Sequence, residues 1–313
     1  MSAATIQRRA HLDAGAILAV TVLCALWGLQ QVSVKVAIAG GMTPALQAGL
    51  RSAIAAVCVF GWIGWHDGRD ALRALWSRDT LVPGALTALV FAAEFLLLYP
   101  GLHLTTASRG VLFLYTAPFF TALGAQLFLP AERMSGTQFA GLGIAFAGVA
   151  AAFADGLGGG GGSLEGDALC LAAGALWGVT TVVVKAYPPL AASPPSKLLF
   201  LQLAGSAPPL FLGAWAMGEL AAPLSATPLA WAGLFYQTII VAFLSYLVWF
   251  RLVLTYPAGR VAGFTFLTPV FGILAGAALL GEHASPALLL GVAAIALGMW
   301  LVNGSRQASG RRT

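Results

Sequence analysis

Charge is the scarcest property of this chain. Of its 313 residues only 9% are Asp, Glu, Lys or Arg, whereas 59% are hydrophobic. A soluble protein of this length needs far more charge to keep its surface hydrated. The mean hydropathy of +0.87 points in the same direction. The composition therefore excludes an ordinary soluble protein and predicts that long apolar runs face lipid.

Cysteine and histidine are also scarce, with three and four copies. Cys24, Cys58 and Cys170 all fall inside apolar runs, where a thiol is a small packing residue rather than part of a disulfide or metal framework. The histidines lie at the ends of runs or between them, and none belongs to an HExxH motif. We therefore expect no metal and no cofactor.

Motifs for catalysis and nucleotide binding are missing as well. The sequence has no GxSxG nucleophile motif and no Walker A lysine. The glycine run at 156–163 lacks a preceding strand and a following Lys-Ser/Thr, so we interpret it as a flexible linker. We expect the chain not to be an enzyme, with an unusual lipid-modifying membrane enzyme as the alternative.

The apolar runs are long enough to cross a bilayer, since a helix needs about 20 residues to span a hydrocarbon core of roughly 30 Å. We predict an all-α membrane protein with ten transmembrane helices, at 14–38, 44–65, 80–101, 106–129, 135–154, 164–187, 195–217, 227–254, 258–280 and 285–303.

One half of the chain repeats the other. Residues 25–35 read ALWGLQQVSVK and residues 175–185 read ALWGVTTVVVK. Likewise RGVLFLYTAP ends at Pro118 and RVAGFTFLTP ends at Pro269. Such a long repeat in an apolar chain predicts a transporter built from duplicated halves. We expect a first repeat at 1–155, the linker at 156–163 and a second repeat at 164–313.

The distribution of basic residues predicts the topology. With both termini in the cytoplasm, most lysines and arginines fall on the cytoplasmic side, and Lys35, Arg51 and Arg109 are the exceptions. The basic excess is thus a topology signal, and we expect no nucleic-acid partner. Five spans in each half is an odd number, so the second half would be inverted relative to the first.

Polar stripes on two matched spans predict a central cavity. Residues four apart share one helix face. The first stripe consists of Trp27, Gln31 and Lys35, and the second of Trp177, Thr181 and Lys185. Polar groups in a membrane helix turn toward protein or a wet cavity. The alternative is that both lysines extend to the interface and anchor helix ends.

Glu94 lies well inside the third predicted span, where an ionised carboxylate costs at least ~2.5 kcal/mol. Arg51 reaches a similar depth, about 10 Å from the outer end of its span. We expect the two to pair or to share a wet site, and the alternative is a structural ion pair. The second half has Leu201 and Ser245 at these positions, so a charged site in one half only suggests substrate or proton handling.

Further candidates flank two prolines. Tyr115 lies shortly before Pro118, and Tyr246 is a candidate for the lining from the eighth span. Pro118 and Pro269 each remove a backbone hydrogen bond and would bend the helix. They are equally consistent with hinges for alternating access and with static kinks.

Together these motifs resemble the EamA family of the drug/metabolite transporter superfamily. The resemblance rests on LWG in each half, Arg51 after TPALQAGL, the two proline spans, and Glu132 and Glu282 before glycine-rich spans. It implies a ten-helix, inverted-repeat carrier of the inner membrane that moves small metabolites such as amino acids. Glu94 departs from the general family pattern.

From these observations we expect a secondary transporter, acting as an exporter of small metabolites such as amino acids by alternating access. The expected partners are a small-molecule substrate and the lipid bilayer, with proton coupling through Glu94 as an option and a monomer or homodimer as the assembly. The alternative functions are a flippase for lipids or lipid-linked sugars and, ranked lower, an integral-membrane enzyme.

Overall fold

The computed structural model describes residues 13–128, 136–157, 162–221, 225–255, 265 and 267–309, and it contains no strand within them. Glu132 and Arg260, two of the residues that mark the repeat, lie outside the described residues. The helices follow the predicted runs closely. Their bounds are α1 Ala14–Ala39, α2 Pro44–Trp62, η1 Ile63–Asp67, α3 Arg69–Ala74, α4 Arg78–Leu104, α5 Ala107–Leu114, α6 Ala117–Phe128, α7 Gly136–Leu157, α8 Leu164–Ala186, α9 Pro188–Ala191, α10 Pro195–Ala216, α11 Pro228–Phe235, η3 Tyr236–Ser245, α12 Tyr246–Thr255, α14 Leu267–Leu280 and α15 Pro286–Ser309.

Seven helices or helix pairs within the described residues are long and apolar enough to cross a membrane. Three shorter apolar helices, at Phe139–Ala151, Leu267–Leu280 and Pro286–Gly298, occupy the fifth, ninth and tenth predicted runs. The ninth run begins at residue 258, outside the described residues. An all-helical membrane fold is therefore observed, and the count of ten spans stays a prediction.

Short polar residues fix where several helices begin. Thr106 accepts a hydrogen bond from the Arg109 backbone N–H at 3.1 Å, and Ser163 accepts one from the Gly166 N–H at 3.0 Å. Each side chain satisfies a donor that the first helical turn leaves without a partner. The starts of α5 and α8 lie at the same end of the bundle, next to the end of α4. The Ser163 N–H, at the start of α8, donates there to the Leu104 carbonyl.

Besides the second span, which ends in the π-helical turn η1, two spans depart from regular α-helix. The fourth is broken between α5 and α6 at Tyr115 and Thr116, immediately before Pro118, which has no N–H to continue the ladder. The eighth contains the π-helical segment η3 between α11 and α12. Widened π turns are often found at functional sites. The α5–α6 break lines the cavity described below through Leu114, Tyr115 and Pro118, and η3 directly precedes the cavity-lining Tyr246.

Helices that correspond in the two halves pack against each other in opposite directions. The end of α10 meets the start of α2, where Glu219 accepts from the Leu46 N–H at 2.8 Å. At the other end, Asp67 after α2 accepts from the Ser196 hydroxyl at the start of α10, at 3.0 Å. The two helices are thus antiparallel and tied at both ends.

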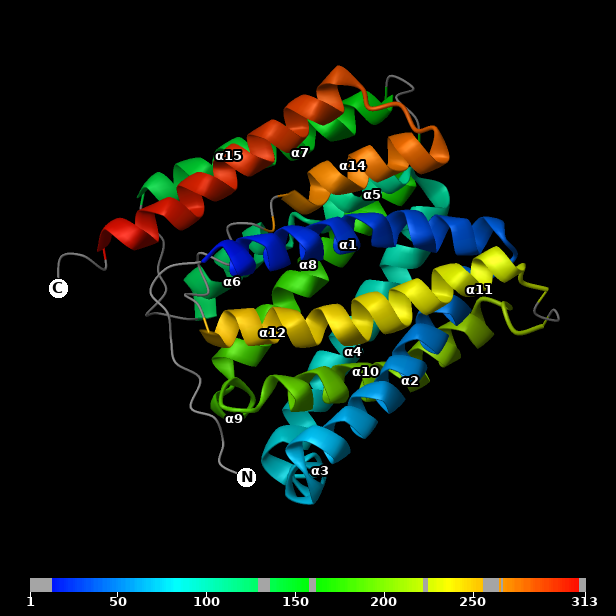
Figure 1. Cartoon of the computed structure of the whole chain (residues 1–313). Helices are drawn as coiled ribbons and strands as arrows, with labels where there is room; N and C mark the ends of the chain where they lie inside the picture. Colours follow the sequence, from blue (N-terminus) through cyan, green and yellow to red (C-terminus); the bar gives the residue numbers. More distant parts are fainter. Residues whose placement is uncertain are drawn as a thin grey trace.

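The α7 and α15 pair follows the same rule (Figure 1). A Cβ at Gly148 would lie 2.9 Å from the Gly291 carbonyl oxygen, and one at Gly298 would lie 2.4 Å from that of Gly141. The lower-numbered end of one helix therefore meets the higher-numbered end of the other. Small residues let the two backbones approach this closely.

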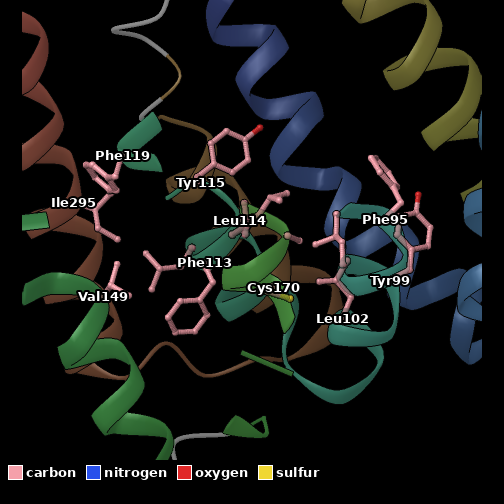
Figure 2. Close-up of a cluster of buried hydrophobic side chains, with 14 of the residues drawn as sticks. Phe95, Tyr99, Leu102, Phe113, Leu114, Tyr115, Phe119, Val149, Cys170 and Ile295 are labelled. Atoms are coloured by element: carbon pink, nitrogen blue, oxygen red, sulfur yellow. The ribbon is translucent and has the colours of Figure 1, made fainter. Parts of the chain in front are cut away.

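The largest apolar core joins α4, α5, α6 and α8, with α7 and α15 at its edge (Figure 2). Its middle is formed by side chains on either side of the α5–α6 break. The residues drawn there include Leu102, Phe113, Leu114, Phe119, Val149, Cys170 and Ile295. This core fixes the break against α8, so the groups before Pro118 have a defined position beside the cavity.

Candidate functional site: a central cavity

A cavity of about 210 Å³ lies in the middle of the bundle. Its wall is formed by α1, α2, α4, α5 and α6 of the first half and by α8, α12 and Thr265 of the second, and seven of its fifteen lining residues are aromatic. The lining residues are Trp27, Gln30, Gln31, Arg51, Phe91, Glu94, Phe95, Leu98, Leu114, Tyr115, Pro118, Trp177, Tyr246, Trp249 and Thr265.

Arg51 and Glu94 meet in this cavity, as the sequence suggests, but they form no ion pair. Within the described residues no N···O contact of 4.0 Å or less joins them. Both are buried, at 2% and 4% exposure. The Nε and Nη1 atoms of Arg51 and the Oε2 atom of Glu94 have no hydrogen-bond partner within the described residues. The Arg51 guanidinium and the Glu94 carboxyl group therefore lie apart, and each has polar atoms that could hydrogen-bond to a ligand.

Two neighbouring groups shape the surroundings of these charges. The Arg51 Cζ atom lies 4.5 Å from the centre of the Phe95 ring, a cation–π arrangement that holds the guanidinium in place. The Gln31 Oε1 atom is buried and has no partner within the described residues. Because unpaired buried polar atoms are costly, a cavity containing three such groups favours a polar ligand.

Aromatic residues line opposite walls of the cavity. Trp27 packs against Tyr246 and Trp249, with ring centres 6.0 and 5.2 Å apart. Across the pseudo-repeat, Tyr115 packs edge-on against Trp177 at 5.4 Å. The two tryptophans of the repeated LWG motif thus occupy comparable positions. Flat apolar walls of this kind bind the non-polar body of a ligand.

Hydrogen bonds fix the orientation of Trp27. Its Nε1 donates to the Ser245 hydroxyl at 2.8 Å, and that hydroxyl donates to the Val241 carbonyl at 2.6 Å. Ser245 is the last residue of η3. The π-helical segment therefore holds one wall of the cavity through this serine.

A buried chain of amides supports the site from behind. The Tyr99 hydroxyl donates to Gln237 Oε1 at 2.6 Å, and Gln237 Nε2 donates to Gln47 Oε1 at 2.8 Å. Gln47 precedes Arg51 by one helical turn on α2. The chain joins α4, η3 and α2, which carry Glu94, Ser245 and Arg51, and so it holds the three segments in register.

Three predicted residues lie outside the cavity lining. Lys35 donates to the Leu102 and Thr105 carbonyls at the end of α4, at 2.8 and 2.5 Å. Thr181 donates to its own helix, to the Trp177 carbonyl at 3.1 Å. Lys185, in the last turn of α8, is likewise absent from the lining. The C-terminal residues of the two stripes therefore lie outside the cavity lining, while Trp27, Gln31 and Trp177 line the cavity.

The two prolines differ in their surroundings. Pro118 lines the central cavity, directly after the α5–α6 break. Pro269 lies in the first turn of α14, where a missing N–H removes no bond within that helix. It contributes to a smaller crevice together with Tyr115, Pro118 and Thr265. Pro118 is likewise in the first turn of its helix, α6, so the two prolines differ in the cavities that they line and not in their position within a helix.

Sequence reasoning missed six of the fifteen lining residues. Phe91, Phe95, Leu98, Leu114 and Trp249 are apolar residues in apolar helices, so nothing in the sequence separates them from lipid-facing neighbours. Gln30 could have been found, since an amide in a membrane span turns away from lipid. Metal binding has no visible basis, because the described residues hold no cluster of three or more His, Cys, Asp or Glu side chains.

The chain is similar to a curated protein and to a solved structure. A protein of Salmonella typhimurium (strain LT2) named "Probable amino-acid metabolite efflux pump" is 29% identical over 286 residues, covering 88% of this chain and 90% of its own length. A protein known from a crystal structure superposes with a TM-score of 0.65 at 17% identity, covering 94% of this chain and 99% of its own, and shows the same fold.

The family match is the decisive one. The EamA-like transporter family matches residues 14–154 and, a second time, residues 164–304. The apolar helices and this match together make the chain a multi-pass membrane protein of a transporter family, with two family repeats. The chain belongs to the EamA-like transporter family.

Proposed function

We propose that this protein is a secondary carrier that exports small zwitterionic metabolites such as amino acids by alternating access. The observation that carries the proposal is the pair of unsatisfied charged groups, Arg51 and Glu94, in one aromatic-walled cavity. A carboxylate on the ligand would accept from the guanidinium, and an ammonium group would donate to the Glu94 carboxylate. The non-polar part of the ligand would lie between Trp27 and Trp177.

The arrangement of matched helices supports an inverted repeat of ten spans. α2 corresponds to α10 and α7 to α15 in the repeat, and both pairs pack antiparallel. Copies inserted in the same direction would give parallel pairs. Two inverted halves around a mid-membrane site are the architecture of carriers that expose the site alternately to either face. The positive-inside rule favours both termini in the cytoplasm, and the inner membrane is what the resemblance to the family implies.

The size of the cavity favours a small ligand over a lipid-linked sugar. Its volume of about 210 Å³ is below the roughly 300–1,000 Å³ of pockets for drug-sized molecules. This observation favours the carrier over the flippase alternative. Among the described residues that line the cavity there is no Ser, Cys or His that a neighbouring base could activate as a nucleophile, which favours the carrier over the enzyme alternative.

The test measures counterflow in proteoliposomes with L-leucine, N-acetyl-L-leucine and L-leucine methyl ester. These ligands differ by loss of the ammonium or of the carboxylate charge. Each charge-assisted hydrogen bond contributes about 1.5–3 kcal/mol, so Glu94→Gln and Arg51→Gln should each weaken apparent L-leucine affinity about 10- to 100-fold. Glu165→Gln and Arg78→Gln, at exposed helix starts, are the matched controls.

The ligand series makes the assignment of partners specific. Glu94→Gln should have little further effect on the N-acetyl compound, and Arg51→Gln little further effect on the methyl ester, because the interacting charge is already missing. Equal losses for all three ligands would assign both residues a structural role. If none of the three exchanges while the reconstituted protein is folded, the amino-acid substrate class is rejected.

Proton coupling through Glu94 is tested separately. Uptake of L-leucine is measured with and without a pH gradient in wild type and in Glu94→Gln. If Glu94 carries the proton, the gradient dependence disappears in the variant and exchange at equal pH persists. A gradient dependence that survives in Glu94→Gln would remove this residue from the role.

A further inference from the structure

A second group of charges lies away from the cavity, at the end of the bundle where α5 and α8 begin. Arg109 and Asp167 are 1% and 0% exposed. The Arg109 Nε donates to both Asp167 oxygens, at 3.1 and 3.0 Å, and Nη2 donates to Oδ2 as well. This buried, two-pronged ion pair joins α5 directly to α8.

Neighbouring groups extend the ion pair to three more helix ends. The Thr105 hydroxyl donates to Asp167 Oδ1 at 2.6 Å, and Lys35 donates to the Thr105 carbonyl. Glu282, after α14, accepts from the backbone N–H groups of Ala107 at 2.7 Å and Ser108 at 2.9 Å. We call Lys35, Thr105, Arg109, Asp167 and Glu282 the terminal cluster. It ties together the ends of α1, α4 and α14 and the starts of α5 and α8.

The terminal cluster lies on the helices that form the cavity wall. Lys35 follows Gln31 by one turn on α1, about 6 Å further along the axis. Asp167 precedes Trp177 by about 15 Å on α8. Arg109 lies on α5, which ends at the cavity-lining Leu114. The cluster therefore closes the bundle directly beyond one end of the cavity.

A buried ion pair contributes little net free energy to the stability of a fold. Apolar residues of similar volume often give equal or greater stability, because the desolvation of two charges offsets their attraction. The same pair suits a contact that must open, since both ions are well hydrated once water enters. An apolar contact of the same area would expose hydrophobic surface each time it separated.

We propose that the terminal cluster is a gate that seals the cavity at this end, and that transport requires the Arg109–Asp167 pair to separate. The inference rests on the alternating access proposed above. In the sealed state the two charges satisfy each other. In the open state α5 and α8 move apart and both charges are hydrated.

A native cysteine next to the Arg109–Asp167 pair can report whether this gate opens. Cys170 is one turn after Asp167 on α8 and is 0% exposed. It packs where α4 and α5 approach α8, since a Cβ at Gly101 would lie 2.9 Å from its sulfur and one at Gly110 would lie 3.6 Å away. Figure 2 shows the sulfur enclosed among core side chains near Leu102 and Leu114. Opening of the gate would expose this thiol.

The experiment compares N-ethylmaleimide alkylation rates of two single-cysteine proteins in proteoliposomes. One keeps Cys170 and the other keeps Cys24, which is also 0% exposed but belongs to a different core cluster. Asp167→Asn should raise the Cys170 rate at least about tenfold and leave the Cys24 rate within about twofold, because opening is local. Glu165→Gln, an exposed carboxylate in the same first turn of α8, should change neither rate.

Two results would overturn the gate. One is an unchanged Cys170 rate in folded Asp167→Asn, and the other is equal acceleration of Cys170 and Cys24, which would indicate general loosening. If Asp167→Asn does not fold, Arg109→Lys replaces it. That variant keeps the charge but loses the two-pronged geometry, so Cys170 should again react selectively faster, and an unchanged rate rejects the gate. Alkylation needs no substrate, so these results stand even if the amino-acid proposal fails.

Discussion

The glycine of the repeated LWG motif gives the sharpest prediction on packing. Gly28 lies where α1 crosses α14, and a Cβ there would be 2.6 Å from the Gly272 nitrogen and 2.9 Å from the Phe271 carbonyl carbon. Gly178 is in the same position on α8, where a Cβ would be 2.6 Å from the Phe120 Cβ. The third close neighbour of Gly28 is the Phe271 Cβ, at 2.9 Å. Backbone atoms and a Cβ are fixed by the backbone and cannot rotate away. Alanine at position 28 must therefore push the two helices apart.

The magnitude follows from two opposing effects. Overpacking a close contact costs about 1–3 kcal/mol, whereas replacing glycine by alanine inside a helix returns roughly 0.5–1 kcal/mol. Gly143 in α7 is the matched control, because a Cβ there would meet nothing within 4 Å. The helix-propensity gain is common to both variants. Their difference in stability should therefore equal the overpacking cost alone, about 1–3 kcal/mol.

The assay is the fraction of folded protein recovered by size-exclusion chromatography after heating in dodecyl maltoside. Gly28→Ala should have a lower midpoint than wild type, and Gly143→Ala an equal or higher one. L-leucine exchange should also fall in Gly28→Ala, because displacing α1 shifts Trp27, which lines the cavity. Equal midpoints for the two alanine variants would show that the α1–α14 contact does not need a glycine, and the packing argument would be wrong.

Three further predictions concern single contacts. Trp27→Phe and Ser245→Ala each remove one side of the same hydrogen bond, so both should lower L-leucine exchange with normal membrane yield, and the double variant should be no worse than the single ones. Lys35→Met should lower the thermal midpoint, since two carbonyls at the end of α4 lose their donor, and unchanged stability would leave the lysine without a structural role. Glu219→Gln weakens the clamp on the first turn of α2 and should cost about 0.5–2 kcal/mol in the same heating assay.

Helix positions were largely predictable because apolar run length is a direct physical signal. The first predicted span, 14–38, and the observed α1, Ala14–Ala39, differ by one residue. The repeat also indicated which helices correspond. The sequence could not indicate the π-helical segment η3, because a widened turn depends on how neighbouring helices pack.

The lining was predictable only where polarity stands out against an apolar background. Gln31, Arg51 and Glu94 were found for that reason, and all three face the cavity. Lys35 satisfies the same rule and the same helical spacing, yet it meets the end of α4 instead. Spacing defines a face of a helix, but the angle at which α1 approaches α4 decides where along that face the cavity ends.

Asp167 of the terminal cluster was not identified from the sequence, for a different reason. Asp167 lies in the first turn of α8, where a carboxylate is expected to interact favourably with the helix dipole and attracts no attention. Only the tertiary structure brings Arg109 to it. A pair separated by 58 residues in sequence has no local pattern from which it could be recognised.

The charge asymmetry of the cavity bears on the resting orientation of the protein. If the halves were identical, exchanging them would interconvert the two end states, which would then be equal in free energy and equally populated. The second half has Leu201 and Ser245 at the positions equivalent to Arg51 and Glu94, so the two end states differ in free energy. If the protein works by the alternating access proposed above, the empty carrier is therefore expected to populate one of its two end states more than the other.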